Sequence, residues 1–159
     1  MRTPARLATT VAVGALAIAA IAAPVSAAPA NKGTTTVAPS ALTGSVLAGV
    51  AKPGYLTSNG AVFGVVGNPA DGTIEHVGGL YVNGVGGTLE LRNFTIRVTD
   101  GKVSGIVNDS FRADLFYFDP ADAGDGVVTL RFTGTASSAV VGSDAIMGAV
   151  AGTATVSLK

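Results

Sequence analysis

Short runs in which apolar and polar residues alternate, each ended by a glycine-bearing turn, constrain this chain more than any other feature of its sequence. The clearest runs cover residues 73–82 and 88–98, and Asn83-Gly84 with the glycines that follow predicts a hairpin between them. About seven such runs, with little helix between them, predict a single all-β domain. We expect an antiparallel β-sandwich or a Greek-key barrel with at most one or two short helices.

Successive side chains of a strand point to opposite faces of its sheet, so this alternation also predicts which residues are buried. His76, the only histidine of the chain, falls on the apolar face of the first run, and Tyr81 falls on the opposite face. The residues predicted to face the interior together are Ile74, His76, Leu80 and Val82.

The second run contains an irregularity in its apolar positions. They are odd up to Leu91 and even from Phe94 onward, so one residue must be absorbed between them. A β-bulge near Arg92-Asn93 is the simplest way to keep both halves facing the interior.

The first thirty residues have the composition of an export signal. Arg2 and Arg6 precede an alanine-rich apolar run, and Val25-Ser26-Ala27 supplies the small residues of a cleavage site. The apolar run is shorter than the roughly 20 strongly apolar residues of a membrane span. We therefore expect a signal peptide over 1–27, a flexible Pro-, Thr- and Ala-rich leader over 28–39, and a β domain over 40–159. No transmembrane span is expected after cleavage.

Charge and cysteine content narrow the classes of function. The chain balances 10 Lys+Arg against 10 Asp+Glu, and loss of Arg2 and Arg6 would leave 8 against 10. Such a chain has no basic patch to neutralise several phosphates, so nucleic-acid binding is not expected. The absence of cysteine excludes thiol catalysis and cysteine-based metal sites.

Two resemblances involve the segment around the histidine. Residues 72–80 (G-x-I-x-H-x-G-G-L), residues 89–96 (LELRNFTI) and the closing G-T-A-x-V strand at 152–156 resemble a group of exported actinobacterial β-proteins of unsettled function. This resemblance covers most of residues 36–159 and implies a shared β-fold. Residues 72–80 are also similar to secreted haem-uptake domains of the HtaA type, which bind haem through a tyrosine supported by a histidine. The tryptophan expected near the start of such a domain is missing, since the chain has none.

The histidine therefore has two interpretations. His76 could be a core residue bonded to a backbone carbonyl or a carboxylate, or it could support a haem-ligating tyrosine. A pair with Tyr81 would require a bulge at Gly78-Gly79. As a core residue His76 should have a pKa below its usual value of about 6.5 because burial disfavours the cation. His76→Leu should then be tolerated if the residue only fills space.

Other candidate sites are weaker. One histidine without cysteine is a poor metal site, and Asp119, Asp122 and Asp125 lack the spacing of a calcium loop, so no metal is assigned. No G-x-S-x-G motif is present, and no catalytic residue is assigned.

These observations favour a non-enzymatic structural or interaction domain. It would be secreted to the cell envelope or the extracellular space, where it would act without a cofactor on an unidentified envelope or protein partner. The alternative is a carrier of haem or another small ligand of the HtaA type, with His76 and Tyr81 as ligand-binding residues and haem as the only cofactor.

Overall fold

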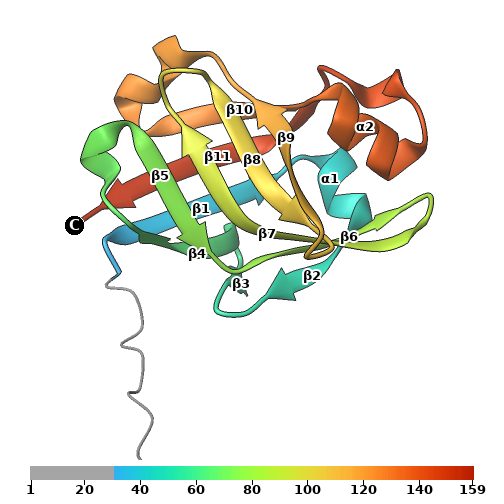
Figure 1. Cartoon of the computed structure of the whole chain (residues 1–159), viewed down its shortest axis with the longest axis horizontal. Helices are drawn as coiled ribbons and strands as arrows, with labels where there is room; N and C mark the ends of the chain where they lie inside the picture. The colour runs from blue at the N-terminus through green and yellow to red at the C-terminus, as the bar shows by residue number, and fades with distance from the viewer. Residues whose placement is uncertain (1–30) are drawn as a thin grey trace, which may run out of the picture.

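The computed structural model describes residues 31–159, in which one antiparallel sheet closes on itself as a barrel (Figure 1). The wall follows the order β7-β5-β4-β1-β11-β10-β9-β8, and the pairing of β7 with β8 completes the ring. The strands of this ring are β1 (Gly33–Pro39), β4 (Gly60–Val66), β5 (Thr73–Val77), β7 (Gly87–Arg97), β8 (Lys102–Val107), β9 (Phe111–Tyr117), β10 (Val127–Phe132) and β11 (Val150–Leu158).

Three further strands extend the wall on its outside edge. β6 (Gly79–Gly84) continues β5 and pairs with the first half of β7, β2 (Leu47–Ala51) pairs with β6, and β3 (Tyr55–Thr57) pairs with β4. The prediction of an all-β antiparallel domain is confirmed, and the sheet takes the form of a closed barrel. A sandwich or Greek-key arrangement is not confirmed.

The helical segments are short. They are α1 (Ala41–Val46), α2 (Gly134–Val141) and the 3-10 turns η1 (Pro69–Asp71), η2 (Pro120–Asp125) and η3 (Asp144–Ile146). Figure 1 shows α1 and α2 at the same end of the barrel. Ser40 caps α1 by accepting a hydrogen bond from the Thr43 backbone N–H at 3.2 Å, a role that serine commonly takes. None of the helices in residues 31–159 has the length and apolar character needed to cross a membrane.

The hairpin predicted over residues 73–98 lies where the sheet divides. Its first arm is β5 and β6 in succession, and its second arm is β7. The predicted bulge is confirmed, because the register of β7 against β8 shifts between Arg92 and Thr95, and Asn93 has a φ of 49°. The four residues predicted to face the interior are all buried: Ile74, His76, Leu80 and Val82.

The first strand corrects the prediction of a flexible leader over 28–39. Residues 33–39 form β1, which lies between β11 and β4 in the barrel wall. Thr34, Thr35, Thr36 and Val37 are all β-branched, a type favoured in strands, although the surrounding Pro and Ala give the segment the composition of a linker. The predicted signal peptide over 1–27 lies outside the described residues.

The interior of the barrel is filled by apolar side chains from every strand of the ring. Phe63 and Phe94 meet edge to face with their ring centroids 5.5 Å apart, an arrangement that aromatic pairs prefer. The buried residues of this core that lie on the five strands β4, β5, β7, β9 and β10 include Phe63, Val65, Ile74, Phe94, Ile96, Leu115, Phe116, Leu130 and Phe132. Because these side chains occupy the space inside the ring, the barrel is a packed core.

Candidate functional site

His76 projects from β5 into the barrel and is only 4% exposed. Its Nδ1 lies 3.1 Å from the backbone oxygen of Phe94, and its Nε2 lies 2.7 Å from Oγ1 of Thr35. A carbonyl oxygen can only accept a hydrogen bond, so Nδ1 carries the proton and donates a hydrogen bond to the Phe94 oxygen. In this neutral tautomer Nε2 accepts a hydrogen bond from the Thr35 hydroxyl.

The bulge in β7 makes the Phe94 carbonyl available to the histidine. Pairing between β5 and β7 ends at Glu75 and Thr95, one position short of His76 and Phe94. The Phe94 oxygen therefore accepts from the imidazole. Since Thr35 belongs to β1, the two hydrogen bonds connect β1, β5 and β7 through the interior of the barrel.

Burial lowers the pKa of His76 below its usual 6.5, and the hydrogen bond to the Phe94 carbonyl opposes this only in part. The shift of the His76 pKa predicted from the sequence is in the same direction. The folded protein thus holds a neutral imidazole, while the unfolded chain binds a proton below about pH 6.5.

This difference in proton binding predicts a pH dependence of stability. The contribution from neutral His76 is complete above pH 6.5 and is lost as the pH falls toward the lowered pKa of the folded state. In that window the free energy of unfolding should fall by up to about 1.4 kcal/mol per pH unit from this group. Because the chain has a single histidine, the NMR signal of its imidazole Hε1 reports the pKa directly. A titration midpoint at or above 6.5 would contradict the prediction.

The space beside His76 is small. An interior void of about 50 Å³ is bounded by His76, Thr35 and apolar side chains of the core. Sites for drug-sized ligands usually enclose about 300–1,000 Å³. This void therefore holds little more than a few water molecules.

The structure does not bring His76 and Tyr81 together. Tyr81 lies on β6 and is 37% exposed, whereas His76 faces the interior. Glu90 is paired with Tyr81 across the β6–β7 ladder, and it raises the pKa of the Tyr81 phenol above 10.0 by hydrogen bonding and by its charge. Gly78 does interrupt the strand between them, with a φ of 95°, but the two side chains remain on opposite faces.

The acidic loop forms η2, and its carboxylates are spread along it. Asp119 caps this turn by accepting a hydrogen bond from the Ala121 N–H at 2.9 Å. Asp122 and Asp125 are exposed. No group of three His, Cys, Asp or Glu side chains in residues 31–159 is arranged to hold a metal ion.

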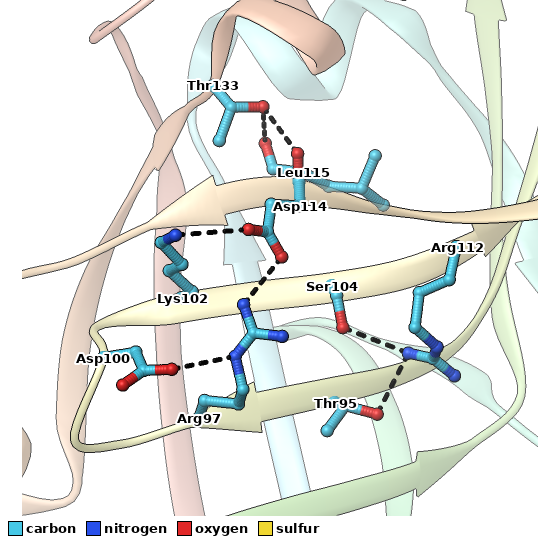
Figure 2. A network of polar contacts seen from close by, with 9 residues as sticks. All are labelled: Thr95, Arg97, Asp100, Lys102, Ser104, Arg112, Asp114, Leu115 and Thr133. Atoms are coloured by element: carbon cyan, nitrogen blue, oxygen red, sulfur yellow. Dashed lines mark hydrogen bonds and ion pairs between the residues drawn. The ribbon is translucent and has the colours of Figure 1, made fainter.

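The outer face of β7, β8 and β9 carries a network of ion pairs (Figure 2). Asp114 accepts from Nη2 of Arg97 at 2.8 Å and lies 3.4 Å from Nζ of Lys102, while Asp100 lies 3.2 Å from Nε of Arg97. The charges on these four side chains balance. We interpret this network as a set of ion pairs that holds neighbouring strands together.

Arg112, on the same face, differs from that network in its partners. Its guanidinium donates to Oγ1 of Thr95 at 3.0 Å, to Oγ of Ser104 at 3.1 Å and to the backbone oxygen of Asn93 at 3.1 Å. All three acceptors are neutral. Among residues 31–159 Arg112 has no carboxylate within 4 Å. It therefore places beside the bulge a positive charge that has no ion-pair partner among residues 31–159.

A groove of about 540 Å³ lies on the outside of the barrel, where the sheet divides. β5 pairs with β4 as far as Val77, and after Gly78 the continuing strand β6 pairs with β2 instead. The turn from Lys52 to Tyr55 crosses this junction. The polar side chains that line the groove are Asn31, Thr34, Lys52, Tyr55, Arg92 and Asn93.

The floor of the groove is apolar. It is made by Gly64 and Val66 of β4, by Val77 of β5 and by Gly78. Sequence reasoning indicates only the bulge at Arg92-Asn93 among the parts of this groove. The other polar residues have no shared motif, since they come from two separate segments of the chain, residues 31–34 and 52–55.

No family model, curated protein or solved structure matches this chain.

Proposed function

We propose that this protein is an exported, non-enzymatic interaction domain of the cell envelope or the extracellular space. The barrel is its scaffold, and the outer groove is its contact site. The observation that supports this reading is the placement of its polar groups. Both ring nitrogens of His76 are used inside the fold, by Thr35 and Phe94, whereas six polar side chains line a groove open to solvent.

The groove suits binding better than catalysis. Its lining contains no histidine, carboxylate or serine, so Thr34, Lys52 and Tyr55 have no such group within the lining to activate them as nucleophiles. Lys52 and Arg92 carry fixed positive charge, and Asn31, Thr34 and Asn93 offer neutral hydrogen bonds. These groups can recognise a ligand without transforming it. Export is the expectation from the N-terminal sequence.

A screen for turnover tests the non-enzymatic part of the proposal. The purified protein should release no product above the buffer blank from generic chromogenic esterase, glycosidase and peptidase substrates. Turnover that co-purifies with the protein through two chromatographic steps, and that is changed by Lys52→Gln, would overturn the proposal.

Haemin titration distinguishes this function from the haem-carrier alternative. For His76 to contact haem it would have to give up its bonds to Thr35 and Phe94 and leave the barrel interior, while Tyr81 lies on the other face. We expect the Soret band of haemin to be the same with the wild-type protein as with His76→Ala. A sharpened, shifted Soret band that His76→Ala weakens would contradict this expectation and favour the carrier.

A further inference from the structure

We propose that the outer groove binds a small acidic saccharide, a uronic acid or a short chain of them, through its carboxylate and hydroxyl groups. This inference rests on the proposed function, because it names the class of ligand for the same groove. It is argued from the donors that line the groove, from the charges around it and from its floor.

Each polar side chain of the groove can donate a hydrogen bond, and no carboxylate lines it. Asn31 is already oriented, because its Oδ1 accepts from the Gly33 N–H at 2.9 Å. This leaves its Nδ2 as a donor, and that nitrogen lies beside Gly64 of the floor. A lining rich in donors fits a ligand rich in acceptors, such as a polyhydroxylated acid.

Two cations line the groove, Lys52 just after β2 and Arg92 on β7, and these two strands flank β6. Lys52 has no carboxylate within 4 Å among the described residues. Arg92 is held by Glu90 at 3.3 Å through Nε and by Asp109 at 3.6 Å through Nη1. These contacts engage Nε and Nη1 and leave Nη2 for a ligand. A planar guanidinium donor pairs well with a carboxylate.

Two charged residues lie next to the groove without lining it: Arg112, and the exposed Glu75, which is paired with Val66 of the floor. Arg112 donates to the backbone oxygen of Asn93, whose side chain lines the groove. Glu90 and Asp109 compensate Arg92, but Lys52 and Arg112 are both left without an acidic partner among residues 31–159. Within the lining, Lys52 is the cation left without an ion-pair partner among residues 31–159, and such a charge attracts anions. The groove therefore favours an acid over a neutral sugar.

The floor and the rim explain why the ligand should be a saccharide. Gly64 presents bare backbone, and Val66 and Val77 add an apolar surface on which the C–H face of a sugar ring can rest. Tyr55, which is 56% exposed, stands at the rim with an aromatic face and a hydroxyl. The volume of about 540 Å³ is within the range of small-ligand sites.

Calorimetric or NMR titration with galacturonic acid and with galactose tests the inference on the full-length protein. The acid should bind and galactose should bind at least about tenfold more weakly, which is the effect of losing one charge-assisted hydrogen bond. Lys52→Gln should weaken binding of the acid by a similar factor. Lys102→Gln is the matched control, because it removes the same charge from the ion-pair network on β8 and should leave the affinity unchanged.

A second variant blocks the groove without removing charge. A side chain at Gly64 would point outward over the floor, and its Cβ would meet nothing closer than Cγ2 of Val77 at 3.5 Å. Gly64→Leu should therefore fold normally, as circular dichroism can verify, and should lose binding of galacturonic acid.

Three results would overturn the inference. They are equal binding of galactose, equal binding of inorganic phosphate at the same NMR-mapped residues, and no binding of galacturonic acid to the wild-type protein. Equal binding of galactose would show that the groove recognises the sugar ring without its charge. Equal binding of phosphate would show that it recognises charge alone. These three results concern binding alone. A failure of the proposed function would instead appear as turnover of the chromogenic substrates, so the two failures are distinguishable.

Discussion

Replacing His76 with leucine should lower the free energy of unfolding by about 2–5 kcal/mol, because two buried polar groups lose their partners. The Thr35 hydroxyl and the Phe94 carbonyl both bond to the imidazole, and leucine can satisfy neither. Urea denaturation of the two proteins measures the change. Leucine was expected to be tolerated only if His76 did no more than fill space, and the two hydrogen bonds change that expectation.

A double-mutant cycle shows whether the hydrogen bond between His76 and Thr35 is responsible for this loss of stability. Thr35→Val keeps the shape of the side chain and removes its hydroxyl, so alone it should cost about 1–2 kcal/mol. With His76→Leu already present, the same change should cost little or even stabilise, since the hydroxyl no longer has a partner. Costs that simply add in the double variant would show that the two side chains are not coupled.

Replacing Gly78 with alanine should destabilise the protein by about 2–4 kcal/mol, from backbone strain and from overpacking. Its φ of 95° is unfavourable for residues with a side chain. An added Cβ would also lie 2.7 Å from the Gly54 nitrogen and 3.0 Å from the Ala51 oxygen, which are backbone atoms and cannot rotate away. Thermal or urea unfolding measures this loss.

Gly64→Ala is the matched control for that change. Gly64 also lies on the floor of the groove, but its φ is outside the left-handed region and its nearest neighbour to an added Cβ is a valine methyl at 3.5 Å. Alanine there should be neutral or should stabilise by up to about 1 kcal/mol. If both alanines had the same effect, the backbone geometry at Gly78 would not be what constrains the residue.

Gly78 links stability to the candidate site. Its close contact with the turn at Gly54 holds Lys52 and Tyr55 beside the floor of the groove. Gly78→Ala should therefore also weaken binding of galacturonic acid, even at temperatures where the variant is fully folded.

Much of the β structure is predictable from local sequence, because strand periodicity needs only the burial of one face. The alternation from Ile74 to Val82 correctly places His76 in the interior, and the change of parity after Leu91 correctly locates the bulge. In β9 Leu115 and Phe116 are both buried, and Leu115 is the extra residue at the point where the register with β8 shifts. The apolar side chains at both positions are visible in the sequence, whereas the shift depends on the pairing with β8.

The sequence by itself determined the all-β class, the buried histidine and the position of the bulge, since each depends on residues close together in the chain. Only the tertiary structure decided that residues 33–39 form a wall strand, because their burial comes from pairing with β4 and β11. The same holds for the partners of His76, which lie 41 and 18 residues away along the chain. It holds for the groove as well, whose donors come together only because β5 and β6 part at Gly78 to pair with different strands.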